Sequence, residues 1–444
     1  MIMGSGEMRR LLGAVEKNFP GLSGSVEVCM SVVNAMNLKD YENPLGMILV
    51  GVPSSGKTTT LDMFEGDFFI PLDDWTPEAF VSHVSKKRKK DLLEVMRHKC
   101  LVTAEMGPFF SKKTTEDLSR AVAYIVRIFD GKGFMKGTGN LDDGAIKGHR
   151  GDYRFSWLGA TTPFSNKVWN VMGKLGNRLL FYNLEAGKMA EDLDWRKERY
   201  SVKMAECQKH VRRVLRVIPY SYEWDDGNDD REQVFRIVKL SILLCKLRAV
   251  VHVWKGEKDE SGKSEYEFLS PMIEDNKRCF NQLYLIARGR AMLYGRDRIS
   301  KDDVDMVSEI VKASAPYERH LILTHLVENG GSCSYDEMSE FLNCSPANIT
   351  RIVKKLDILR ICEHDKFEGH VKLSKDFSWL VNGTSMKICL SLEDRVLASI
   401  HKHPTHIKDV INRFNGEDIE PVLEKLKANG QIMFQTPTMV MRNA

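Results

Sequence analysis

Apolar runs of strand length alternate with segments of helical character between residues 46 and 184. This alternation predicts a mainly parallel sheet whose strands are joined by helices, the α/β class of fold. The first run, Met47–Val50, is apolar throughout, as expected of a strand that is buried on both faces. The other expected strands are Phe68–Pro71, Cys100–Glu105, Phe155–Ala160 and Leu179–Asn183.

The rest of the chain is mainly helical in pattern. A polar loop at 255–264, which we interpret as a solvated insertion, interrupts the helical stretch 188–315. Two short blocks of helices followed by β-prone residues come next, and they look like a tandem pair of similar units. We therefore expect an N-terminal helical segment, an α/β core, a helical domain with an insertion and two small C-terminal domains, at 1–45, 46–187, 188–315, 316–380 and 386–444.

The first C-terminal block contains a helix-turn-helix pattern at residues 334–359. Ser345 is typical of an N-cap and Pro346 of a first helical residue, so a second helix begins there. Its basic residues Arg351, Lys354 and Lys355 face outward, and the stretch 369–374 supplies a wing strand. This is the pattern of a winged helix that contacts DNA phosphates, although a winged helix that docks protein is an open alternative.

The second C-terminal block has the same shape but an acidic second helix. Carboxylates repel phosphate, so we expect this winged-helix-like domain to dock a protein partner instead of DNA. The acidic residues are Glu417, Asp418, Glu420 and Glu424.

Composition narrows the function classes only slightly. The 444 residues are too many for one compact core, and a formal net charge of +4 permits nucleic acid without requiring it. No apolar run could span a bilayer and no signal peptide is evident, so we expect a cytoplasmic protein without membrane contact. None of the nine cysteines forms a C-x-x-C pair, which argues against zinc and favours free thiols.

The stretch GVPSSGKT, residues 51–58, follows the first strand and precedes a helix start. It has the phosphate-binding loop pattern, in which backbone N–H groups face phosphate oxygens, Lys57 reaches the outer phosphates and the Thr58 hydroxyl ligates Mg²⁺. The helix N-terminus adds to this attraction. ATP and Mg²⁺ are the expected cofactors, and the expected contacts are Gly51, Val52, Pro53, Ser54, Ser55, Gly56, Lys57, Thr58 and Thr59.

Hydrolysis also requires a carboxylate at the end of a neighbouring strand, and Glu105 ends the run CLVTAE. Ala104 replaces the Asp that normally holds the Mg²⁺ hydration shell, a departure that favours slow turnover. Thr161 or Thr162, at the end of another strand, would orient the attacking water or sense the γ-phosphate. Arg178 precedes the last strand, from which it would reach a neighbouring subunit's phosphate as an arginine finger.

A further arginine, Arg278, lies near the start of the helix expected at 275–288 and would contact the γ-phosphate. The ordered set of features over residues 46–315 resembles the AAA+ ATPases, and among them the helicase-like subgroup of the minichromosome maintenance proteins and their mobile-element relatives. The resemblance implies a P-loop parallel-sheet core, a helical lid, C-terminal winged helices and a hexameric ring.

Residues 130–153 are rich in glycine, with a Gly/Asn/Asp tip that predicts a β-hairpin. In the helicase-like subgroup a hairpin before the sensor strand enters the ring pore and grips DNA. The resemblance therefore implies that Lys136, Lys147 and Arg150 contact DNA. Five successive basic residues at 86–90 are more typical of a solvated loop.

These features predict a DNA-dependent ATPase that acts as a ring-forming helicase or remodeller. Two alternatives stay open. One is a slow-turnover, ATP-dependent switch, which Ala104 favours. The other is a DNA-binding regulator, which rests on the winged helices.

Overall fold

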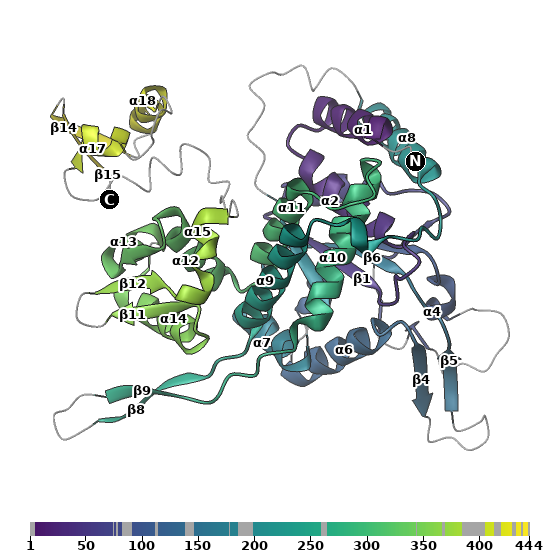
Figure 1. Ribbon diagram of the computed structural model, residues 1–444, viewed down its shortest axis with the longest axis horizontal. Helices are drawn as coiled ribbons and strands as arrows, with labels where there is room; N and C mark the ends of the chain where they lie inside the picture. The colour runs from purple at the N-terminus through teal and green to yellow at the C-terminus, as the bar shows by residue number, and fades with distance from the viewer. Residues whose placement is uncertain are drawn as a thin grey trace. The chain divides into compact units, whose positions relative to one another are not determined.

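The computed structural model describes residues 5–442 apart from 74, 77–78, 82–90, 112–113, 138–145, 177, 185–198, 259–263, 343, 366–368, 384–404, 413–418, 429–431 and 437. The chain forms two compact units, residues 1–317 and 318–444 (Figure 1). The N-terminal segment, the core and the helical domain expected from the sequence therefore share one unit. The basic run at 86–90 lies outside the described residues.

A five-stranded parallel sheet lies at the centre of the first unit, which confirms the expected α/β class. The strand order is β2-β3-β6-β1-β7, and every pairing within the sheet is parallel. Each of the five apolar runs of the sequence forms one strand. The strands are β1 (Leu45–Val50), β2 (Phe69–Pro71), β3 (Cys100–Thr103), β6 (Ser156–Thr161) and β7 (Leu179–Asn183).

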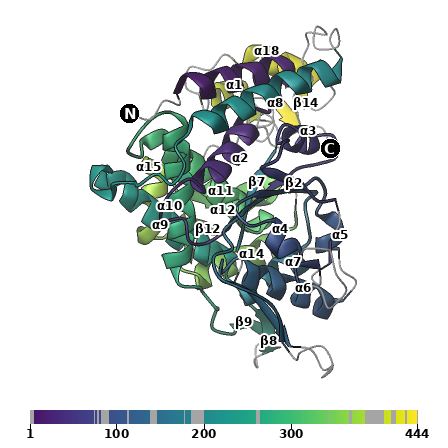
Figure 2. The ribbon, with the colours of Figure 1, turned by 90° about the vertical axis from the view of Figure 1, so that its right-hand side faces the viewer.

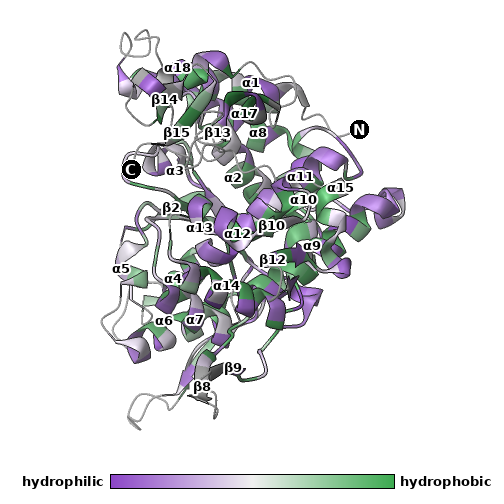
Figure 3. Cartoon of the chain, turned by 90° about the vertical axis from the view of Figure 1, so that its left-hand side faces the viewer, coloured by the Kyte–Doolittle hydropathy of each residue, from purple (hydrophilic) through white to green (hydrophobic). Residues whose placement is uncertain are grey.

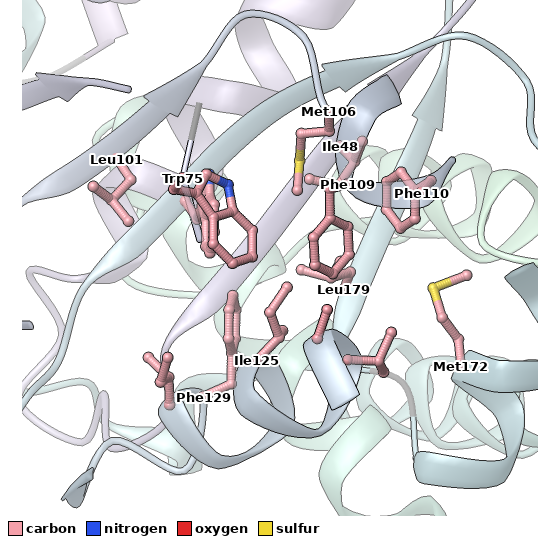
Figure 4. Packing of buried hydrophobic residues seen from close by; sticks show 14 of the residues in the cluster. Ile48, Trp75, Leu101, Met106, Phe109, Phe110, Ile125, Phe129, Met172 and Leu179 are labelled. Atoms are coloured by element: carbon pink, nitrogen blue, oxygen red, sulfur yellow. The ribbon is translucent and has the colours of Figure 1, made fainter. Parts of the chain in front are cut away.

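An aromatic-rich core fills the space between one face of the sheet and α6 (Thr115–Ile128) (Figure 4). Trp75 stacks on Phe109 with ring centroids 4.9 Å apart, and it meets Trp157 edge-on. The Trp157 indole is fully buried and donates its N–H to Thr103 Oγ1 at 2.9 Å, so its polar atom is satisfied. Short helices α4 (Leu92–Val95), α5 (Gly107–Phe110) and α7 (Asn166–Leu175) complete this layer.

Longer helices form the other side of the first unit (Figure 2). The helix α2 (Ser23–Ala35) packs closely on α10 (Asn276–Leu293), because a Cβ on Gly289 would lie only 2.3 Å from the Ser31 carbonyl oxygen. The remaining helices here are α1 (Ser5–Asn18), α3 (Lys57–Asp62), α8 (Tyr200–Val217), α9 (Arg231–Arg248) and α11 (Lys301–Ala313), with the short η4 (Asp226–Asn228). No helix of the described residues combines the length and hydrophobicity that crossing a bilayer requires.

Two antiparallel ribbons extend the first unit. The ribbon β4 (Gly133–Gly137) and β5 (Ile146–Arg150) lies where a hairpin is expected, although its tip at 138–145 lies outside the described residues. The ribbon β8 (Val253–Lys258) and β9 (Ser264–Phe268) includes residues 255–258 and 264 of the expected polar loop, so the loop interpretation is wrong for these residues, while 259–263 lie outside the described residues. At the base of this ribbon Val253 is aligned with Phe268.

The first part of the second unit combines helices with a three-stranded sheet, in the region where a winged helix is expected. The sheet order is β10-β12-β11, and both pairings are antiparallel. Four apolar residues of α14 face its core, namely Ile349, Ile352, Val353 and Leu356. Figure 3 shows hydrophilic and hydrophobic residues on the same helices, as expected where one face is buried. The elements are α12 (Tyr317–Glu328), β10 (Ser332–Ser334), α13 (Tyr335–Leu342), α14 (Pro346–Ile358), β11 (Cys362–Asp365), β12 (His370–Leu373), η5 (Lys375–Phe377) and α15 (Trp379–Gly383).

The last part of the chain repeats this topology on a smaller scale. Its sheet order, β13-β15-β14, again places the last strand between the other two. A small core of its own includes Val410, Leu423 and Val440. The elements are β13 (Thr405–His406), α17 (Ile407–Asn412), α18 (Glu420–Ala428), β14 (Ile432–Thr436) and β15 (Met439–Arg442).

Candidate nucleotide-binding site

The phosphate-binding loop joins the C-terminal end of β1 to the first turn of α3. Ser54 and Gly56 have φ angles of 66° and 86°, in the left-handed region that most residues avoid. A Cβ on Gly56 would lie 2.6 Å from the Leu22 side chain, and one on Gly51 would lie 2.5 Å from a loop hydroxyl. The path of this loop therefore depends on glycine at positions 51 and 56, the two glycines of the phosphate-binding pattern.

Lys57 lies over this loop. Its Nζ donates to the carbonyl oxygens of Gly51 at 2.7 Å and of Val52 at 2.8 Å. Burial lowers the pKa of Lys57, while the nearby Glu105 carboxylate raises it. The lysine charge is therefore concentrated where outer phosphates would meet the loop, and the carboxylate of Glu105 is close enough to interact with it.

Glu105 follows the C-terminal end of β3, beside the strand that carries the threonines. Its exposed carboxylate accepts a hydrogen bond from the Gly107 N–H at 2.7 Å. The next residue, Met106, donates its N–H to the Ala160 carbonyl oxygen at 2.6 Å, which ties this turn to β6. Because parallel strands end at one edge of the sheet, the ends of β1, β3 and β6 converge around the loop.

The threonine pair lies at the same edge. The register aligns Val50 with Thr161, and the Gly51 N–H donates to the Thr161 carbonyl oxygen at 3.2 Å. Thr161 is buried, and its hydroxyl donates to the Thr162 carbonyl oxygen at 3.1 Å. Thr162 is half-buried and lies one residue beyond the strand, closer to solvent than Thr161.

The candidate magnesium ligand Thr58 is exposed on the first turn of α3. Its hydroxyl oxygen is a suitable ligand, because Mg²⁺ prefers oxygen atoms. The two residues before Glu105 add no carboxylate. Thr103 is buried under Trp157, and Ala104 has no polar side chain. Besides Glu105, this strand end therefore offers the ion no carboxylate, and Thr58 on α3 is the candidate protein ligand.

Arg178 lies at the end of the sheet where the parallel strands begin, whereas the loop lies at the end where they finish. The register aligns Gly46 with Leu179, so Arg178 lies level with the start of β1. Six residues of extended chain, roughly 20 Å, separate that level from Gly51. The Arg178 guanidinium is mostly buried and pairs with Asp130 at 3.3 Å. It therefore faces away from its own phosphate-binding loop.

Arg278 lies beside Arg178 and not beside the loop. A Cβ on Gly176 would lie 3.3 Å from Arg178 Nη1 and 3.4 Å from Arg278 Nη2. Arg278 also forms an ion pair with Glu274, one turn earlier. The structure thus brings the two candidate arginines together, and it does not bring Arg278 to the phosphate-binding loop of the same chain.

The candidate DNA residues of the hairpin occupy neighbouring positions. The register places Lys136 directly opposite Lys147, and Arg150 is exposed at the end of β5. Gly148 has φ of 133°, and a Cβ there would lie 2.1 Å from the Phe134 carbonyl oxygen, so the close strand approach requires glycine.

The basic residues of α14 differ in their surroundings. Arg351 is exposed, whereas Lys354 pairs with Asp357 at 2.9 Å. Lys355 is half-buried, and burial together with Arg319 and Arg351 lowers its pKa. The sequence prediction that all three face outward is therefore correct for Arg351 but overstates the exposure of the two lysines.

Sequence reasoning missed the residues that support the site. Asp130 and Glu274 each hold one of the candidate arginines, and Leu22 packs under Gly56. At the start of α8, the Tyr200 hydroxyl donates to Asp62 at 3.1 Å at the far end of α3. No local motif marks these residues, because their partners are mostly tens of residues away.

Comparisons with known proteins give only distant likenesses. No family model matches the chain, and no curated protein matches it. A solved structure described as a candidate ATPase from Cytophaga hutchinsonii has 11% identity and a TM-score of 0.38, covering 79% of this chain and 94% of that one. A full-length MCM homologue from Methanopyrus kandleri has 11% identity and a TM-score of 0.39, covering 70% and 61%. At such scores neither likeness bears on activity, which we infer from the site.

Proposed function

We propose that this chain is an ATPase of the AAA+ class that acts on DNA as a ring-forming helicase or remodeller. The observation that carries the ATPase part is the convergence of Lys57 and Glu105 at the strand ends around a glycine-dependent loop. The strand order also supports it. Counted along the chain within the sheet, it is 2-3-4-1-5, with the loop after strand 1.

In the proposed reaction, Lys57 and the loop N–H groups hold the outer phosphates and offset the charge that develops on them. Bound Mg²⁺, held by Thr58, would add electrostatic stabilisation of that charge. Glu105 leaves its hydrogen bond to the Gly107 N–H and accepts a proton from the attacking water. Thr162 orients that water from the neighbouring strand end.

The arginine pair supports assembly into a ring. Arg178 and Arg278 lie roughly a strand length from their own loop, so they cannot complete this chain's site. We propose that they act on the nucleotide of a neighbouring copy, in a hexameric ring. Arg178 then serves as the finger, and Arg278 accompanies it in place of the same-chain contact expected from the sequence.

DNA is the proposed substrate because two basic surfaces have suitable positions. These are the ribbon with Lys136, Lys147 and Arg150, and the helix α14 with Arg351. For the acidic second winged-helix-like domain we propose a protein partner.

A slow-turnover switch is the second candidate, and Ala104 favours it. Steady-state ATP hydrolysis, measured without DNA and with single- or double-stranded DNA, separates the two. DNA-stimulated turnover is the expected result. Tight ATP binding with almost no turnover, whatever the DNA, would establish the switch instead.

A further inference from the structure

Among the described residues, one cluster of potential metal ligands lies outside the nucleotide site. The Cys245 and Cys279 thiols and the Glu274 carboxylate have ligand atoms that all lie within 4.8 Å of one another. Cys245 is on α9 and Cys279 is on the first turn of α10, with Glu274 just before that helix. Three separate positions of the chain therefore converge on one point.

The two thiols and the carboxylate already lie close to one another, as the ligands of a metal ion would. The Cys279 thiol donates to Glu274 Oε1 at 3.4 Å, and the Cys245 thiol lies 4.0 Å from the Asp275 carbonyl oxygen. Both cysteines are buried, while the Glu274 side chain is 20% exposed and opens a path from solvent. A tetrahedral zinc ion requires ligand atoms roughly 3.5–3.8 Å apart, so only a small contraction is needed.

We propose that Cys245, Glu274 and Cys279 bind a thiophilic divalent cation, Zn²⁺, with water as the fourth ligand. Two thiolates and a carboxylate match the preference of zinc for sulfur with one harder ligand. They also leave the site with one negative charge. The Arg278 guanidinium, which pairs with Glu274 through its other oxygen, neutralises that charge.

The site would have a mechanical consequence. It would fasten the last turn of α9 to the beginning of α10, and it would fix the carboxylate that holds Arg278. Outer partners orient the metal ligand that they contact, and the ion pair ties the two groups to each other. The metal would therefore set the position of Arg278 beside Arg178. This proposal concerns metal binding alone and does not depend on ATP hydrolysis.

The test is metal binding by the full chain, purified under reducing conditions without nucleotide. We expect one equivalent of Zn²⁺ by elemental analysis, and Co²⁺ titration should give the near-ultraviolet charge-transfer band of thiolate ligation. Cys245→Ser and Cys279→Ser should each abolish the band, and Glu274→Gln should weaken Co²⁺ binding about tenfold or more. Cys207→Ser, a buried thiol on α8, is the matched control and should bind like the parent.

Several results would overturn the proposal. One is a reduced parent chain that binds neither Zn²⁺ nor Co²⁺. Another is a Cys245→Ser/Cys279→Ser double variant that keeps the band while its circular dichroism matches the parent. A third is that the purified chain contains a Cys245–Cys279 disulfide and binds no metal after this disulfide is reduced.

Discussion

Arg178 and Arg278, one hundred residues apart in the sequence, approach the same glycine, Gly176, from two elements of the fold. Each is held by its own carboxylate, Asp130 for the first and Glu274 for the second. The Gln282 amide also donates to the Arg178 carbonyl oxygen at 3.0 Å, which fastens α10 to the start of β7. Two cations are thereby kept close together at the edge of the sheet that lies away from the phosphate-binding loop.

A shared site between copies predicts complementation. Lys57→Ala chains and Arg178→Ala chains should each lose ATPase activity, about 10³-fold for the arginine. Mixtures should recover part of it, because some interfaces pair an intact loop with an intact arginine. Arg127→Ala removes the other arginine that pairs with Asp130, and it should leave activity near the parent level. No recovery at any mixing ratio, with oligomers confirmed by light scattering, would rule out a finger in trans.

The roles of Lys57 and Glu105 predict different defects. Lys57→Ala removes the charge that offsets the outer phosphates, so ATP binding should weaken strongly in an equilibrium titration. Glu105→Gln keeps the size of the side chain and the nearby loop, so binding should persist while hydrolysis falls by about 10²-fold or more. Hydrolysis by Glu105→Gln at the parent rate would mean that another carboxylate acts as the base.

The ribbon predicts a coupling defect. Lys136→Ala together with Lys147→Ala should remove stimulation of the ATPase by DNA and leave the basal rate unchanged, because both residues belong to the β4–β5 ribbon and not to the sheet that carries the loop. The measurement is ATP turnover over a DNA concentration series. Lys427→Ala, an exposed lysine on α18, serves as the control. Full stimulation in the double variant would favour the switch over the motor.

The exposure of Arg351 predicts that it contributes most of the anchoring by α14. Arg351→Ala should weaken DNA binding and reduce the slope of log affinity against log salt by about 0.9, the value for one phosphate contact. Lys354→Ala should change the slope less, because its ammonium is engaged by Asp357. Affinity and salt slope that stay at the parent values in both variants would identify α14 as a protein-docking helix.

His325 predicts that the part of the second unit around α12 to α14 is sensitive to acid. Its half-buried ring stacks on Phe341, and burial lowers its pKa to about 4 despite the nearby Glu337. The folded state keeps this ring neutral, while the unfolded chain takes up a proton below its ordinary pKa near 6.5. Stability should therefore be full above about pH 6.5 and fall as the pH drops toward 4.

Hydrogen exchange in the full chain tests that trend. Protection of amides in α12 to α14, corrected for intrinsic rates, should decrease between pH 7 and pH 5. His325→Gln should flatten the dependence, whereas His370→Gln on β12 should not. Equal slopes in the parent and in His325→Gln would show that another group is responsible.

Local patterns in the sequence determined much of this molecule. Five apolar runs specify the five strands, and Ile349, Val353 and Leu356 of α14 face its core. The pattern of a phosphate-binding loop can be recognised in the sequence because its chemistry requires particular residues within eight positions. The ribbon that contains Lys136 can be predicted for a similar reason, since a short stretch rich in glycine with a Gly/Asn/Asp tip specifies a hairpin.

Only the tertiary structure decided which distant side chains meet. The spacing of Cys245 and Cys279 argues against zinc, yet packing of α9 on α10 brings the two thiols together with a carboxylate. Likewise the sequence placed Arg278 at the nucleotide of its own chain, and the direction of α10 places it beside Arg178. Short-range periodicity encodes helices and strands through the repeat of each element. Meetings across tens of residues depend on how those elements pack, and that packing is a property of the whole core.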